Sequence, residues 1–326
     1  MSLLTAEYDY ELPEELIARY PTERRQESRL LLVDRKAQSL TDHRFADFPD
    51  LIGTDSLTVL NDTRVIPARL KFRLRNAELL LLEQIDIRTW RALVRPGQFF
   101  RRGRQFTELE FAGRVIEIEM DGTRKIEFGE PLDLDKVGEL PLPPYLGRDV
   151  EPLDRERYQT TYANQPGAIA APTAGLHFTT ELLNQINHCF ITLHVGVGTF
   201  RPVKAARISE HAMHAERYEI SVDSAGRIDS ALHVVAVGTT TVRALEATVQ
   251  QCGAIVPGRY TTDIFIYPGF HFQRVNSLLT NFHLPRSTLL MLVAAFAGHE
   301  FILEAYRRAV KERYRFFSYG DCMLIR

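Results

Sequence analysis

Residues 234–253 read VVAVGTTTVRALEATVQQCG, and this stretch sets the fold class. Its first four residues are all apolar, which is typical of a buried strand. Gly238 then permits close approach of the backbone, and residues 239–252 have the pattern of a helix that opens on three threonines. Gly253 follows directly, and a glycine just past the last helical residue is a common C-cap. The stretch therefore predicts a strand–turn–helix unit, the repeating element of α/β proteins.

Similar apolar runs recur along the chain. Further strands are expected at residues 57–60, 168–171, 190–195, 263–267 and 278–282. Several of these runs lead into helical patterns. Ser287 is a candidate N-cap for an apolar helix, and the residues after position 299 show apolar side chains at a helical period. Most of the chain is therefore predicted to be α/β.

One central region has a different pattern. Residues 69–75 alternate strictly between charged and apolar side chains, which is the period of a half-buried strand. Two further alternating runs, 115–120 and 123–128, flank Asp121-Gly122. An Asp-Gly pair between alternating runs is a strong hairpin signal, because a tight turn needs positive φ. This region is predicted to be a small antiparallel barrel or sandwich.

Two proline-containing segments mark the ends of this β region. Residues 140–145 read LPLPPY, and proline favours extended, stiff backbone. The other junction lies at residues 66–67. The predicted organisation is a discontinuous α/β catalytic domain of residues 1–66 and 152–326, with residues 67–151 inserted as a small all-β domain.

Length and composition limit the class of protein. The chain has 326 residues, 45% hydrophobic and 25% charged, which excludes a disordered, collagenous or coiled-coil protein. Cys189, Cys252 and Cys322 are far apart and form no CxxC pair, so a reducing compartment without structural zinc is expected. The N-terminus does not resemble a secretory signal, and the longest apolar stretch, 288–298, is too short to span a membrane. A soluble cytoplasmic protein is expected.

Two glycine-containing loops follow predicted strands. Residues 238–243 (GTTTVR) open a helix, whose free N–H groups suit a carboxylate or phosphate. The alternative is a capped helix start without a ligand. Residues 196–200 (GVGTF) form a second loop, but a lone Gly-x-Gly is a weak signal, and a tight structural loop is the alternative. Neither loop is a dinucleotide fingerprint or a P-loop, which argues against a Rossmann dehydrogenase and a P-loop NTPase.

Histidines stand out in three motifs. His177 follows a strand pattern, and histidine is the commonest acid/base residue, although a helix-capping role is an alternative. On a helix, His211 and His214 would share a face near Glu216. That set is a weak metal signal, so acid/base or substrate contacts are favoured over a metal, with an exposed turn as the alternative. His283 ends another strand and shares a face with its neighbouring asparagine, either as a site or as a buried hydrogen-bonded pair.

A stripe of basic side chains alternates along the first strand of the β region. Arg69, Lys71, Arg73 and Arg75 project from one face of this strand. Such a stripe can neutralise phosphates and make binding salt-dependent. The alternative is the solvated face of a sheet. The formal net charge is −2, so any nucleic-acid contact needs a local basic surface of this kind.

Eight motifs occur in a fixed order along the chain. They are NDTRVIPAR (61–69), PTAGLHF (172–178), LHVGVGTFRPV (193–203), HAMHAE (211–216), VGTTTVRALE (237–246), IFIYPGF (264–270), TNFHLPRSTL (280–289) and YRFFSYGD (314–321). With these motifs the sequence closely resembles the S-adenosylmethionine:tRNA ribosyltransferase-isomerase family of queuosine biosynthesis. The resemblance covers nearly the whole chain and is weakest in the β region.

This resemblance implies a specific reaction. The ribosyl part of S-adenosylmethionine is transferred and isomerised onto the 7-aminomethyl-7-deazaguanine wobble base of tRNA, giving epoxyqueuosine-tRNA, adenine and methionine. It also implies a barrel-like α/β domain with an inserted antiparallel β-barrel domain. No metal, redox cofactor or membrane is implied, and a monomer is expected. The competing hypotheses are a non-catalytic RNA-binding module and a barrel enzyme acting on a free small metabolite.

The resemblance also marks candidate site residues. The acid/base candidates are His177, His194, His214, Glu216 and His283. The candidates for binding S-adenosylmethionine are Gly196, Gly198, Thr199, Phe200, Gly238, Thr239, Thr240, Arg243, Tyr267 and Asn281. Among the latter, the two glycine-containing loops are expected to hold the methionine carboxylate and the ribose, and an aromatic ring such as that of Phe200 or Tyr267 would face the sulfonium.

Overall fold

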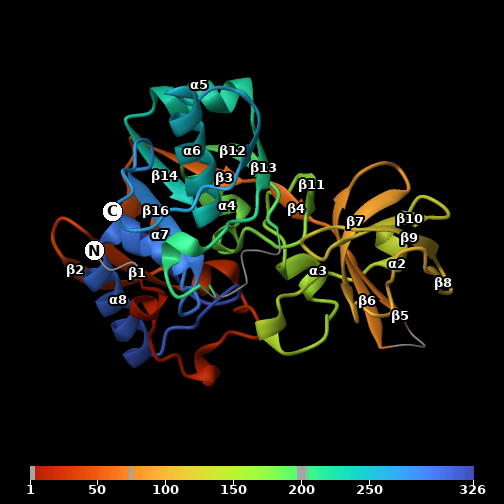
Figure 1. Ribbon diagram of the computed structural model, residues 1–326. Helices are drawn as coiled ribbons and strands as arrows, with labels where there is room; N and C mark the ends of the chain where they lie inside the picture. The colour runs from red at the N-terminus through yellow and green to blue at the C-terminus, as the bar shows by residue number, and fades with distance from the viewer. Residues whose placement is uncertain (1–3, 73–75, 197–202, 204) are drawn as a thin grey trace.

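The structure is a computed structural model that describes residues 4–72, 76–196, 203 and 205–326. Its larger part is a nine-stranded mixed sheet (Figure 1). In spatial order the strands are β15 (Gly258–Thr262), β13 (Glu216–Ile220), β12 (His188–Leu193), β3 (Ser56–Asn61), β14 (His233–Val237), β16 (Ser277–Asn281), β17 (Cys322–Ile325), β1 (Arg29–Asp34) and β2 (Ser39–Arg44). Strands β12, β3, β14 and β16 run parallel to one another, and β17 pairs in parallel with β1.

Both faces of this sheet are covered. Along β14, Val234 and Ala236 belong to one apolar cluster, whereas Val235 and Val237 belong to another on the opposite face. The longer helices are α5 (Val222–Ser230), α6 (Thr239–Cys252), α7 (Thr288–Ala297) and α8 (His299–Lys311), and the short ones are α1 (Phe48–Ile52), α2 (Leu134–Val137), α3 (Asp154–Arg157) and α4 (Thr180–Leu183). A strand buried on both faces reads as a continuous apolar run, as residues 234–237 do.

The predicted helix signals are confirmed. Gly253 ends α6 in the left-handed conformation, with its N–H donating to the carbonyl of Val249. The Ser287 hydroxyl accepts a hydrogen bond from the N–H of Leu290 and caps α7. No single helix in the described residues is long and apolar enough to cross a membrane, and α7 and α8 pass that test only as a pair bent by 115°.

The smaller part is a six-stranded antiparallel sheet. Its order is β5 (Arg69–Phe72), β6 (Ala77–Gln84), β7 (Thr89–Arg95), β10 (Arg124–Phe128), β9 (Ala112–Ile118) and β8 (Gln105–Thr107). The sheet curls into a half-barrel around aromatic rings, and Phe72 lies 5.4–5.7 Å from four other phenylalanine rings. The predicted turn at Asp121-Gly122 joins β9 to β10, with Gly122 at φ +84°. The predicted α/β fold with an antiparallel β insertion is confirmed.

The two parts are joined by a pair of short strands. The chain leaves the main sheet through β4 (Thr63–Val65) and returns through β11 (Gln165–Ala168), and these two strands pair in parallel. Figure 1 shows the six-stranded sheet standing to one side of the main body beyond this pair. The large cavity described below lies between the two sheets.

Two predicted strands are wrong. Residues 263–267 form no strand, because β15 ends at Thr262 and the following apolar run covers the core, where Ile266 is 1% exposed. Of the predicted strand at 168–171, only Ala168 belongs to β11. Residues 211–215 form neither a helix nor a strand, and Glu216 begins β13, so His211 and His214 share no helix face and the alternative of an exposed segment describes this stretch.

Candidate active site

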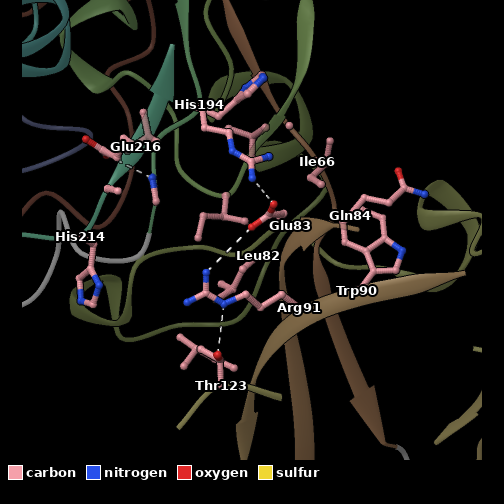
Figure 2. Close-up of a pocket in the computed structure, with 18 of the residues that line it drawn as sticks. Ile66, Leu82, Glu83, Gln84, Trp90, Arg91, Thr123, His194, His214 and Glu216 are labelled. Atoms are coloured by element: carbon pink, nitrogen blue, oxygen red, sulfur yellow. Dashed lines mark hydrogen bonds and ion pairs between the residues drawn. The ribbon is translucent and has the colours of Figure 1, made fainter. Parts of the chain in front are cut away.

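A cavity of about 1450 Å³ lies between the nine-stranded and six-stranded sheets. Its main-sheet side carries His194, Gly196, His214, Glu216 and Arg243. Figure 2 shows Glu216 and His214 on one side of this cavity and residues of the six-stranded sheet on the other. Five of the sequence-predicted site residues are therefore brought together here.

A buried ion pair forms the wall on the main-sheet side. The Glu216 carboxylate pairs with the Arg243 guanidinium, and their exposed fractions are only 7% and 3%. Glu216 faces inward because β13 alternates, with Glu216, Tyr218 and Ile220 buried. The other carboxylate oxygen accepts a hydrogen bond from the Gly196 N–H at 3.4 Å. The carboxylate is thus fixed at the cavity by a cation and a backbone donor.

His194 lies at the end of β12 beside this pair. Its Nδ1 lies 2.8 Å from the Thr63 hydroxyl oxygen, which orients the ring. The ring packs onto Gly167, where an added Cβ would come within 2.8 Å of it. Burial lowers the pKa of His194, so the imidazole is neutral at physiological pH. His214 also lines the cavity, with an exposed side chain.

A second, much smaller cavity of about 60 Å³ adjoins the first. It is lined by Gly238, Thr239 and Thr240 at the start of α6. Val195 and Leu289 line both cavities, so the two are neighbours. No side chain caps the N-terminus of α6 in the described structure, which leaves N–H groups of its first turn for an anion.

Asn281 and His283 line the same small cavity. Asn281 is 2% exposed, and its Oδ1 is buried without a partner in the described part of the chain. His283 Nε2 lies 2.8 Å from the Thr280 hydroxyl oxygen, and burial lowers the pKa of His283 to about 3. This imidazole is therefore neutral.

His177 lies in neither of these cavities. Its Nδ1 is 3.0 Å from the Ser28 hydroxyl, and its Nε2 accepts a hydrogen bond from Asn281 Nδ2 at 3.3 Å. The ring packs on Phe45 and is 3% exposed. Burial, with repulsion from nearby arginines, lowers the pKa of His177 to about 3. His177 thus contacts the small cavity only through Asn281.

The remaining candidates lie elsewhere. Tyr267 is half-buried with its ring 5.2 Å from that of Phe265, and it lines neither cavity. Gly198, Thr199 and Phe200 lie outside the described residues.

Several residues of the cavity were not predicted from the sequence. On the six-stranded sheet, Arg91 pairs with Glu119 at 2.7 Å and with Asp121 at 2.5 Å. Glu83 forms an ion pair with Arg217 of β13, which links the two sheets across the cavity (Figure 2). The sequence signal for these residues was weak, because Glu83 and Arg91 are ordinary charged positions on strands and Asp121 was read only as part of a turn.

The comparison with known families agrees with this architecture. A family model described as "Queuosine biosynthesis protein" matches residues 5–325. The chain belongs to this family. Its members in other organisms include an S-adenosylmethionine:tRNA ribosyltransferase-isomerase from Trichlorobacter lovleyi, which is 46% identical, with 99% of this chain and 100% of the relative covered. The protein of the same name from Carboxydothermus hydrogenoformans is 48% identical, with 98% of each chain covered.

A solved structure of the queuosine family is also similar. The crystal structure of an S-adenosylmethionine tRNA ribosyltransferase from Thermotoga maritima is 38% identical, with a TM-score of 0.55. The alignment covers 98% of this chain and 100% of that one. Within the described ranges of this family member, no group of three or more His, Cys, Asp and Glu side chains is placed to hold a metal ion.

Proposed function

We propose that the chain transfers and isomerises the ribosyl moiety of S-adenosylmethionine onto the 7-aminomethyl-7-deazaguanine wobble base of tRNA. The products are epoxyqueuosine-tRNA, adenine and methionine. Relatives at 46–48% identity over the full chain carry the name of this enzyme. The observation that carries the proposal is the buried pair of Glu216 and Arg243 beside a neutral His194, in a cavity of about 1450 Å³. A cavity of this size has room for two substrates.

Glu216 and His194 are the acid/base groups of this proposal. The sulfonium makes the adjacent 5′ carbon acidic, and Glu216 takes its proton. Arg243 stays protonated and holds the carboxylate in place. The neutral His194 accepts a proton from the attacking amine, and the imidazolium formed in this way can hand a proton to the departing adenine. His214 stands at the same cavity as a further proton carrier.

The small cavity holds the methionine end of S-adenosylmethionine in this proposal. The carboxylate lies at the start of α6, where Gly238, Thr239 and Thr240 leave backbone donors free. The α-ammonium group donates to the unpartnered Oδ1 of Asn281. His177 and His283 are positioning groups for this cavity, because they act through Asn281 and Thr280.

The domain division and the setting belong to the same proposal. The catalytic domain comprises residues 1–66 and 152–326, and the inserted domain comprises residues 67–151. All six strands of the half-barrel fall between residues 69 and 128, inside the inserted range. S-adenosylmethionine serves as ribosyl donor without a metal, and the protein works as a cytoplasmic monomer.

Adenine release tests the function directly. The purified chain is incubated with S-adenosylmethionine alone, with unmodified tRNA, or with tRNA carrying the aminomethyl base, and adenine is measured by chromatography. We expect adenine only in the last case. Release without any tRNA favours an enzyme of small metabolites. Binding of tRNA with no release in any arm favours a non-catalytic RNA-binding module.

A further inference from the structure

The large cavity has a second wall, on the side of the six-stranded sheet. The residues of this wall take no part in the chemistry assigned above. Figure 2 shows Trp90, Gln84 and Ile66 together on the side away from Glu216 and His214. The apolar side chains here include Leu82, Trp90 and Leu93 of the six-stranded sheet and, from the segments before and after it, Ile66, Leu132 and Leu134. A planar aromatic ring within an apolar wall suits a flat, partly apolar ligand.

Trp90 is the central residue of this wall. It is 7% exposed, and its backbone is fixed in register with Gln84 on β6 and Ile126 on β10. Its indole N–H donates to no group in the part of the chain that the structure describes. Buried tryptophans usually have a hydrogen-bond partner for this N–H. A donor that is free at a cavity wall is therefore available to a ligand.

Polar groups without side-chain partners in the described structure line the same cavity as the Trp90 ring. The Gln84 carboxamide and the carboxylates of Asp133 and Asp135 line the cavity, and none has a side-chain partner among the described residues. In contrast, the Asp121 carboxylate on the same wall is neutralised by Arg91. The free groups offer one amide, which both donates and accepts, and two anionic acceptors.

These groups complement a guanine-like base that carries a cationic amine. Such a base has a carbonyl acceptor, several N–H donors and a positive charge, which match the amide, the indole N–H and the two carboxylates. Adenine of S-adenosylmethionine is neutral and gives the carboxylates no counter-charge. Single-stranded RNA loops can splay a base outward onto an aromatic ring.

We propose that the wall of Trp90, Gln84, Asp133 and Asp135 is the subsite for the extruded wobble nucleobase. S-adenosylmethionine then occupies the opposite side, at Glu216. This inference rests on the proposed function. Asp133 and Asp135 favour the aminomethyl base over guanine, which lacks the cationic amine.

Fluorescence gives the first test, because Trp90 is the only tryptophan in the chain. The intact protein is titrated with free 7-aminomethyl-7-deazaguanine, with guanine and with S-adenosylmethionine. We expect the aminomethyl base to change the emission at the lowest concentration, and S-adenosylmethionine to leave it unchanged. A change with S-adenosylmethionine in place of the base would assign this wall to adenine and overturn the proposal.

Variants give the second test. Gln84→Ala should raise the KM for modified tRNA about 2- to 10-fold, the usual effect of one lost hydrogen bond, and leave the KM for S-adenosylmethionine unchanged. Replacing Asp133 and Asp135 together by Asn should lower the preference for the aminomethyl base over guanine about tenfold. Trp90→Phe keeps a smaller aromatic ring in the core and removes the N–H together with part of the indole ring system. Gln105→Ala is the control, since Gln105 is exposed on β8 of the same sheet and does not line the cavity.

The experiments distinguish failure of the proposed function from failure of the subsite assignment. If the wild-type protein releases no adenine with modified tRNA, the proposed function is wrong. If it does release adenine and the Gln84 and Asp133/Asp135 variants keep wild-type KM and base preference, only the subsite assignment is wrong. A rise in the KM for S-adenosylmethionine would also contradict the assignment.

Discussion

Removal of one partner from the Glu216–Arg243 pair should destabilise the protein strongly. Glu216→Gln preserves the side-chain shape but leaves the Arg243 guanidinium 3% exposed without a counter-charge. An uncompensated buried charge costs about 3–5 kcal/mol, against a typical total stability of about 5–15 kcal/mol. If the free energy of unfolding falls by about 3 kcal/mol per M of urea, the urea midpoint of unfolding should fall by about 1–1.7 M. Urea unfolding followed by circular dichroism measures this shift.

A second variant separates stability from catalysis. Replacing Glu216 by Gln and Arg243 by Met together removes both charges, so this variant should be more stable than either single variant. It should still release adenine about 10²- to 10⁴-fold more slowly than wild type, the usual contribution of a general base. Glu219→Gln is the matched control, because Glu219 lies on the same strand in an exposed pair with Arg259 and should change stability by less than about 1 kcal/mol.

Two outcomes would refute this reasoning. If the destabilisations of the two single variants simply add in the double variant, the two side chains are not coupled. If the double variant folds and retains wild-type turnover, Glu216 is not the base, and His194 or His214 becomes the leading candidate.

Three further predictions follow from described contacts. Because folding lowers the pKa of His177 and His283 to about 3, the unfolded chain takes up their protons first as pH falls below about 6.5. The stabilisation that these neutral imidazoles give is therefore complete above pH 6.5. At pH 5.5, protonation in the unfolded chain should lower the free energy of unfolding by about 1.4 kcal/mol for each of the two histidines. Equal urea midpoints at pH 7 and pH 5.5 would contradict this. Arg64 is exposed at the cavity without a partner among the described residues, so Arg64→Gln should flatten the log–log salt dependence of tRNA binding by about 0.7–0.9. Lys71→Gln should change that slope much less, because Lys71 is already paired with two carboxylates, and equal slopes for the two variants would argue against the assignment. Gly238→Val places a branched side chain at φ +88° and should weaken S-adenosylmethionine binding in calorimetry, with tRNA affinity unchanged.

Sequence reasoning succeeded where the signal is local. The turn at Asp121-Gly122, the C-cap at Gly253 and the N-cap at Ser287 each depend on one or two residues and their neighbours. For residues 211–216 the sequence left a shared helix face and an exposed turn both open, and the strand that begins at Glu216 is specified by pairing with β12 and β15, which lie far away in sequence. Pairing of this kind leaves little trace in a local pattern.

In the candidate site too, the sequence identified single residues but not the contacts between residues far apart in the chain. Glu216 and Arg243 were both selected from the sequence, but their ion pair joins β13 to α6 and could not be read from spacing. Trp90 was missed, because on its strand it looks like one more core residue. The basic stripe was ambiguous for the same reason, and the structure pairs Arg69 with Glu78. Arg73 and Arg75, the other end of the stripe, lie outside the described residues.

The place of β17 in the main sheet has a consequence during protein synthesis. Its residues, Cys322–Ile325, lie between β1 and β16, yet they are made after every other strand. At about 5–20 residues per second, roughly 15–60 s pass between translation of β1 and translation of the strand that covers its edge. During that interval the β1 edge of the β1–β2 hairpin is open as well as the β2 edge, and it is an exposed template for wrong pairing. The strands of the six-stranded sheet all come from one continuous stretch of sequence, so none of them depends on a strand made much later. A nascent chain would therefore carry a folded half-barrel before its main sheet is complete.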